Sequence, residues 1–255
     1  MEDDAVRQLL ASEQRLELPE PRWRDLLAQD DHQASPLTGE DVLGPDGTLD
    51  SASSVGLAIK ARAHSIGFAI HNTIVRSESA IWTAVVEMER WIDRQEIVRV
   101  VGAGRALLAA AIPANRLAHA GARVFVLHDV VPLPNTVHGG NILAASASGK
   151  TASVLSIMAT ARRRNPDIRI LGIADASASE FSELCDVFVG VDQTTNPVAN
   201  PLNALADTGE YIISELLDAI VVAAAKRLGY TELQFRQGHE DLADTGPYLP
   251  EQLSP

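Results

Sequence analysis

A six-residue segment, Ser-Ala-Ser-Gly-Lys-Thr, has the residue types of a phosphate-binding loop. The hydroxyls of Ser146, Ser148 and Thr151 can donate hydrogen bonds to an anion. Gly149 lets the backbone approach the anion closely, and Lys150 adds a positive charge. A helix is predicted to follow, and the N-terminal N–H groups of a helix attract negative charge. This segment, the serine loop, therefore predicts a site for a phosphorylated small molecule; a simple helix cap would need only one hydroxyl.

A glycine-rich turn, Val-Gly-Ala-Gly-Arg, ends an earlier predicted strand. Gly102 and Gly104 permit a tight turn into a helix, and Arg105 places a cation at the start of that helix. The dinucleotide-binding fingerprint has a third glycine where Leu107 stands, although Asp129 could serve as its ribose-binding acid. We therefore favour anion binding over dinucleotide binding, and we expect this turn and the serine loop to line one pocket.

The serine loop also fits a relaxed form of the P-loop, the nucleotide-binding loop of many phosphotransferases. In that pattern a first glycine is followed by four residues and then by Gly-Lys-Thr, but Ala144 stands in the place of the first glycine. Asp175 and Asp192 each end an apolar segment and could hold Mg²⁺ for such a reaction. A phosphotransferase is therefore an alternative hypothesis, although aspartates that merely start a loop are the commoner case.

The composition predicts a globular protein with an acidic N-terminal segment. The chain has 255 residues, of which 46% are apolar, and 34 acidic against 21 basic residues give a net charge of -13. Residues 1–50 hold 13 of the acids and 4 of the bases, so the other 205 residues carry 21 acids and 17 bases. Because phosphates would be repelled overall, neither nucleic acid nor an anionic membrane surface is an expected partner.

Cysteine usage and the first residues indicate a compartment. Cys185 is the only cysteine, so no intrachain disulfide can form and there is no zinc signature. The start, Met-Glu-Asp-Asp, lacks the basic and apolar regions of a signal peptide, and no apolar run reaches the ~20 residues of a membrane span. We therefore expect a cytoplasmic protein that needs no metal and no cofactor.

Apolar periodicity predicts an α/β fold behind a long helical segment. Residues 54–94 lack proline and show helical spacing of apolar residues, which indicates one long helix or a helical hairpin. Short apolar runs then alternate with helical stretches, a pattern typical of a parallel sheet covered on both faces. The predicted strands are 97–101, 123–127, 141–145, 168–173 and 187–191, and the predicted helices are 106–120, 151–164, 177–184 and 207–228.

Three regions are predicted along the chain. Residues 1–50 form an acidic extension, residues 51–230 an α/β domain with its leading long helix, and residues 231–255 an extended C-terminal arm punctuated by proline. Apolar residues lie on more than one face of the long helix, Phe68 and Trp82 among them. One sheet surface cannot cover all of these residues, so we expect at least a dimer.

The chain resembles the sugar isomerase (SIS) domain, particularly that of 6-phospho-3-hexuloisomerases. The resemblance rests on Val-Val-Gly-Ala-Gly-Arg at 100–105, Asn-Arg-Leu-Ala-His-Ala-Gly at 115–121 and the serine loop, and it covers about residues 60–228. It implies a flavodoxin-like, three-layer fold with a doubly wound, five-stranded parallel sheet. It also implies a sugar phosphate held by the serine loop, and a homodimer or homotetramer with active sites at subunit contacts.

Two residues depart from the pattern that this family usually shows. Lys150 stands where the family commonly has glutamate, and Ala106 replaces the serine or threonine that commonly follows the Gly-x-Gly-Arg turn. The positive charge of Lys150 compensates for a lost phosphate contact, or else the changed loop indicates a different sugar or binding without turnover.

Glu210 is the candidate base, because it opens the last predicted helix where the resembled hexuloisomerases carry a catalytic glutamate. Aldose–ketose isomerisation moves a proton between adjacent carbons through an enediol, and ring opening often needs an acid. Asp207 and Glu210 also have the spacing of a capping box, which is the structural alternative. His71, on the long helix, and His138 are the candidate acids, each with a structural role as its alternative.

The sequence therefore leads to one main functional hypothesis and two alternatives. The main hypothesis is a sugar-phosphate aldose–ketose isomerase that acts through an enediol. The alternatives are a non-catalytic sugar-phosphate sensor, since similar domains serve as effector modules of transcriptional regulators, and the phosphotransferase. The acidic residues 1–50 argue against direct DNA binding by a sensor.

Overall fold

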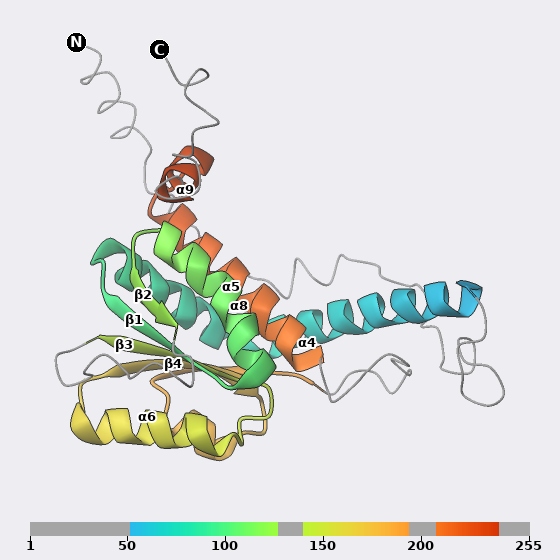
Figure 1. Ribbon diagram of the computed structural model, residues 1–255, viewed down its shortest axis with the longest axis horizontal. Coiled ribbons are helices and arrows are strands. Elements are labelled where there is room, and N and C mark those ends of the chain that lie inside the picture. Colours follow the sequence, from blue (N-terminus) through green and yellow to red (C-terminus); the bar gives the residue numbers. More distant parts are fainter. Residues whose placement is uncertain (1–51, 127–139, 194–207, 240–255) are drawn as a thin grey trace, which may run out of the picture. The chain divides into compact units, whose positions relative to one another are not determined.

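One parallel sheet organises the part of the chain that the computed structural model describes, residues 52–126, 140–193 and 208–239. Within these residues five strands pair in the order β2-β1-β3-β4-β5, and every neighbouring pair is parallel (Figure 1). This arrangement confirms the predicted fold class, a five-stranded parallel α/β sheet. The strands are β1 (Ile97–Val101), β2 (Arg123–Val126), β3 (Asn141–Ser146), β4 (Arg169–Asp175) and β5 (Val187–Val191).

Helices cover both faces of the sheet. Helix α6 lies on one side and helices α5 and α8 lie on the other (Figure 1). Strand β2 lies on one side of β1, whereas β3, β4 and β5 follow one another on the other side. Because such crossovers are right-handed, the reversal places the connecting helices on opposite faces. The helices are α4 (Ala52–Asp93), α5 (Gly104–His119), α6 (Ala152–Arg164), α7 (Ser179–Glu183), α8 (Thr208–Arg227) and α9 (Glu232–His239).

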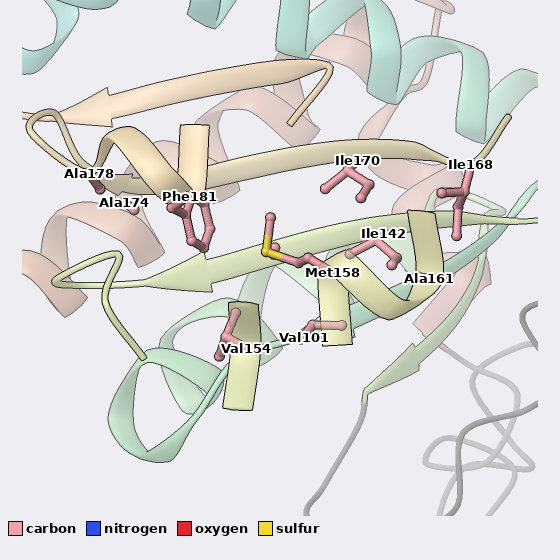
Figure 2. Packing of buried hydrophobic residues seen from close by; sticks show 11 residues of the cluster. Val101, Ile142, Val154, Met158, Ala161, Ile168, Ile170, Ala174, Ala178 and Phe181 are labelled. Atoms are coloured by element: carbon pink, nitrogen blue, oxygen red, sulfur yellow. The ribbon is translucent and has the colours of Figure 1, made fainter. Parts of the chain in front are cut away.

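The core beneath α6 and α7 explains the continuous apolar runs. All six residues of β3 are buried, because a strand inside a doubly covered sheet has no solvent face. Met158 from α6 and Phe181 from α7 are fully buried over Ile142 and Ile170, as Figure 2 shows. Leu143 lies between Ile142 and Ala144 in β3 and is equally buried, but it belongs to the opposite face of the sheet.

The long predicted helix is one helix with a kink. Ser77 has non-helical dihedral angles, φ −110° and ψ 18°, within α4. Its hydroxyl donates a hydrogen bond to the Gly190 carbonyl of β5 at 2.8 Å. Four residues earlier, the hydroxyl of Thr73 accepts a hydrogen bond from the Asp192 N–H at 2.9 Å. Two side chains thus fasten α4 to β5, the strand at the edge of the sheet.

Residues 232–239 form a helix, which corrects the expectation of extended chain for this part of the C-terminal arm. Helix α9 begins at Glu232, because Thr231 and Gln234 form a capping box. The Thr231 N–H donates to Gln234 Oε1 at 2.7 Å, and the Gln234 N–H donates to Thr231 Oγ1 at 3.4 Å. The predicted extension, 1–50, lies outside the described residues, and among the described ones no helix has the length and apolarity to cross a membrane.

We expect Met158→Ala to lower the free energy of unfolding by about 2–5 kcal/mol, because it leaves a cavity in the core under α6. Arg163→Ala, on the exposed side of the same helix, is the matched control and should change stability by less than ~0.5 kcal/mol. Urea denaturation of the two variants measures both values. Equal losses would contradict the assignment of Met158 to a packed core.

Candidate functional site

The two glycine-containing loops lie side by side at one edge of the sheet. Strands β1 and β3 are parallel neighbours, with Val101 opposite Ala144, so the loops that follow them leave from the same edge. A Cβ on Gly102 would lie 2.9 Å from the Leu107 Cα and 3.2 Å from the Ala145 carbonyl oxygen. This close packing requires glycine. The strand order reverses between β1 and β3, and ligands of doubly wound sheets bind at such a point.

Ser146 and Gly149 shape the serine loop from inside. Ser146 is buried, its hydroxyl accepts a hydrogen bond from the Gly149 N–H at 3.1 Å, and it lies 3.1 Å from the Thr151 hydroxyl. Gly149 has a φ of +65°, and a Cβ there would lie 2.2 Å from the Ala178 Cβ. The hydroxyl of Ser146 thus stabilises the loop, and Gly149 is required by both its conformation and its neighbours.

The exposed part of the serine loop carries a hydroxyl that is free to donate a hydrogen bond. Ser148 is exposed, and its oxygen accepts a hydrogen bond from the Lys150 N–H at 3.2 Å. Its own O–H can therefore donate outward. Thr151, which precedes α6, makes no side-chain hydrogen bond that caps the helix. The hydroxyl of Thr151 thus does not cap α6, and the first N–H groups of α6 require acceptors from elsewhere.

Glu210 lies next to the Gly102–Arg105 turn. It occupies the first turn of α8, and its Oε1 is 3.4 Å from Arg105 Nη2. The side chain of Glu210 is 16% exposed and that of Arg105 is 49% exposed. The second oxygen, Oε2, is buried and has no hydrogen-bond partner among the described residues. A buried carboxylate oxygen without a donor is costly, and such groups are frequent where a ligand binds.

The α5 helix presents its N-terminus at the same edge. Gly104, its first residue, has a φ of +54° and open space where a Cβ would lie. Ala103, which precedes it, makes no side-chain cap. Helices α5 and α6 follow adjacent strands, so their two N-termini flank the edge at which β1 and β3 end.

Gln193 connects these elements, and the sequence motifs did not single it out. Its side-chain Nε2–H donates a hydrogen bond to the carbonyl of Ala147, inside the serine loop. Its carboxamide also packs on Gly209, the residue before Glu210. The only sequence signal is position, because Gln193 comes two residues after the end of β5, at the edge where ligands of parallel sheets collect.

Of the two candidate histidines, only His71 lies among the described residues. His71 is half-buried on α4, two residues before Thr73, which bonds to the end of β5. Within the described residues no hydrogen bond or ion pair joins His71 to Glu210 or to the serine loop. His138 and Asp207 lie outside the described residues, so the second acid and the capping box stay predictions.

The geometry does not favour the phosphotransferase alternative. Ala144 is paired inside β3, so the chain is an extended strand where a P-loop would already be turning. The Asp175 carboxylate accepts hydrogen bonds from the N–H of Ser177, at 2.9 Å, and from its hydroxyl. Asp192 is buried and pairs with Arg76 at 2.6 Å. Both carboxylates thus serve protein partners. Asp129, named for the dinucleotide alternative, lies outside the described residues.

Cys185 and a cavity between α4 and β5 are two further features of the structure. Burial raises the pKa of the Cys185 thiol to about 12, with a further contribution from the Asp186 charge, so Cys185 is not a nucleophile at neutral pH. A cavity of about 550 Å³ lies between α4 and β5, bordered by Ser77, Phe188 and Asp192 among others. It is lined by none of the residues predicted for the sugar-phosphate site.

Sequence comparison finds relatives that are named isomerases, while no known family profile matches the chain. The chain is 28% identical over 143 residues to the 3-hexulose-6-phosphate isomerase of Methylomonas aminofaciens, covering 55% of this chain and 77% of the relative. It is 35% identical over 119 residues to the enzyme of the same name from Mycobacterium gastri, covering 41% of this chain and 59% of the relative.

Solved structures with a similar fold include a protein with an inferred isomerase function and two proteins in complex with ligands. A Methanococcus jannaschii protein with an inferred 3-hexulose-6-phosphate isomerase function has a TM-score of 0.55 at 19% identity, covering 72% of this chain and 98% of that one. An E. coli protein in complex with A5P has a TM-score of 0.58 at 18% identity, covering 74% and 99%. Vibrio vulnificus NanR in complex with ManNAc-6P has a TM-score of 0.55 at 18% identity, covering 75% and 69%. The chain therefore has the fold of the sugar isomerase (SIS) domain, and the relatives named above are 3-hexulose-6-phosphate isomerases.

Proposed function

We propose that this chain isomerises a phosphorylated sugar through an enediol. The observation that carries the proposal is Glu210, a largely buried carboxylate beside Arg105, at the sheet edge that also presents the serine loop. An anion-binding loop and a nearby carboxylate are the two groups that such an isomerase needs. The names of the relatives make 3-hexulose 6-phosphate the first substrate to test, and aldose–ketose pairs of other sugar phosphates come next.

The phosphate would bind between the two loops. Ser148 donates its hydroxyl proton, Lys150 contributes charge, and the N-termini of α5 and α6 supply backbone N–H groups. Arg105, at the start of α5, would contact the phosphate from the side of the Gly102–Arg105 turn. Gly104 leaves open space where a side chain would stand, whereas Gly102 and Gly149 let the two loops pack closely on their neighbours. Ser146 and Thr151 hold the serine loop in shape.

Glu210 would transfer the proton. Its carboxylate removes the proton from the carbon beside the carbonyl, and the carbonyl oxygen takes up a proton from solvent to become a hydroxyl of the enediol. The same group returns its proton to the former carbonyl carbon, while the neighbouring hydroxyl releases its proton to solvent and becomes the new carbonyl. No oxidant or reductant is needed, because the two carbons exchange oxidation states. We keep His71 and His138 as the proposed acids for ring opening, with His71 acting from a partner subunit.

Homo-oligomerisation is part of this proposal. Phe68 on α4 and Leu108 and Ile112 on α5 are exposed large apolar residues, at 46%, 61% and 62%. These residues are available for burial by a second copy of the chain, as a homodimer or homotetramer.

A non-catalytic sensor is the second candidate function. The likeness in fold to Vibrio vulnificus NanR favours it. That structure is described by its bound ligand, ManNAc-6P, and not by an isomerase activity. Binding would be shared by both functions, whereas exchange of a carbon-bound proton would occur only in an enzyme.

A screen of sugar phosphates tests the proposal as a whole. A sugar phosphate that binds only the folded protein raises its stability by about 2.7 kcal/mol at 100 times its Kd, which thermal shift detects. We expect 3-hexulose 6-phosphate or a related sugar phosphate to give this shift, and the free sugar to give none. Proton NMR in heavy water then follows isomerisation and exchange. Binding without exchange would support the sensor, and no binding by any sugar phosphate would refute both functions.

Replacing Ser148 by alanine should weaken binding of the sugar phosphate by roughly 1.5–3 kcal/mol, the range for a hydrogen bond to a charged group. Isothermal titration calorimetry measures this loss. Ser156→Ala removes an exposed hydroxyl from α6 and is the matched control, with unchanged affinity expected. If Ser148→Ala also left the affinity unchanged, the serine loop would not hold the phosphate through this hydroxyl.

Replacing Glu210 by glutamine should abolish exchange of the substrate's carbon-bound proton and leave binding nearly intact, because glutamine keeps the shape and loses the basicity. The ion pair to half-exposed Arg105 contributes little, so the loss of stability should be under ~1 kcal/mol. Glu215→Gln, exposed on the same helix, is the control and should stay active. Full activity of Glu210→Gln would exclude Glu210 as the base, and Lys150 would be tested next.

A further inference from the structure

We infer that Gln193 is a positioning residue, whose carboxamide sets the position of the serine loop relative to the first turn of α8. The inference rests on the proposed function, because those two elements carry the phosphate-binding groups and the base. Gln193 is half-buried between them. Its side chain is the described group that contacts both the backbone of the serine loop and the residue next to Glu210.

On the loop side, Gln193 determines the orientation of one peptide group. The Ala147 carbonyl accepts hydrogen bonds from Gln193 Nε2–H and, at 3.2 Å, from the Asp175 N–H. A carbonyl oxygen has two lone pairs, so both are used. Because a trans peptide is planar, the N–H of Ser148 points away from the side that Gln193 occupies. Gln193 thereby holds one backbone N–H of the serine loop in a fixed direction for the anion.

On the helix side, Gln193 lies directly against the backbone of α8. A Cβ on Gly209 would lie 3.0 Å from the Cδ and Nε2 atoms of Gln193 and 3.1 Å from its Oε1. Gly209 is buried, and Glu210 follows it immediately. One planar carboxamide therefore separates the serine loop from the residue before the base, and the absence of a side chain at 209 makes room for it.

Gln193 can act as a spacer because the chain before it is anchored. The Asp192 N–H donates to Thr73 Oγ1 at 2.9 Å, and the Asp192 carboxylate lies 2.6 Å from Arg76 Nη1. Helix α4 thus fixes the end of β5, and the side chain of Gln193 projects from a fixed point. Without its N–H donor, the Ala147 peptide loses one of its two bonds, and the loop can shift relative to Glu210.

Gln193→Glu tests the inference, because it keeps the size of the side chain and removes the donor. Inorganic sulfate is the probe, since it stays a dianion between about pH 5 and pH 8. At about pH 8 the introduced carboxylate faces the Ala147 carbonyl, and we expect sulfate affinity to fall about tenfold. Towards pH 5 the carboxyl takes up a proton and donates again, so the affinity should recover. Calorimetry at both pH values measures the effect.

Two further variants keep the test decisive. Gln95→Glu makes the same change in an exposed turn before β1, and it reports any effect of pH on sulfate binding that all variants share. Gly209→Ala leaves Gln193 itself intact and displaces its carboxamide, so sulfate affinity should fall at both pH values without recovery. With an active substrate, kcat of Gln193→Glu should show the same recovery on acidification.

The outcomes separate this inference from the proposed function. Wild-type affinity for sulfate in Gln193→Glu at about pH 8, or a loss that does not recover towards pH 5, would overturn the positioning role. Unchanged affinity in Gly209→Ala would do the same. If the wild-type chain itself bound no sulfate, the anion site of the proposed function would fail, and the inference with it.

Discussion

Backbone pairing between β1 and β3 determines where the other groups at the carboxyl edge of the sheet can lie. Every β1 residue from Val98 to Val101 has a partner in β3, and the loops after both strands leave from adjacent positions. Because the strand order reverses at this pair, α5 and α6 depart to opposite faces and leave a space between their N-termini. Helix dipoles, the turn at Gly102 and the serine loop meet there as a result of topology, before any side chain contributes.

The edge is completed by groups that come from distant parts of the sequence. Helix α8 adds Glu210, and α4 adds Arg62, whose guanidinium lies 5.0 Å from the ring centre of Tyr211. Helix α4 is kinked at Ser77, the residue whose hydroxyl bonds to β5. The same helix therefore stabilises the edge strand and borders the first turn of α8. A partner subunit that packed on α4 would lie near the candidate site.

Local pattern predicted the sheet and its two loops, whereas contacts between distant residues had no signal in the sequence. The buried strands were predicted to within two residues because a strand covered on both faces is apolar throughout, as in β3. The juxtaposition of Gly102 and the serine loop followed from the rule for parallel sheets. Gln193 was missed, because its bond to Ala147 spans 46 residues and depends on the register of β5. Helix α9 was not predicted, although Thr231 and Gln234 form a local capping signal, because the prolines later in the tail favoured an extended chain.

The position of Arg105 gives a physical reason for a lysine in the serine loop. Arg105 lies against Glu210, so part of its charge is balanced by a carboxylate. A phosphate that entered between the loops would share Arg105 with that carboxylate, and the two negative groups would repel each other. Lys150 is exposed on the other loop, after β3. Under the proposed function Lys150 and Arg105 would share the phosphate, so a smaller part of the Arg105 charge would be drawn away from Glu210.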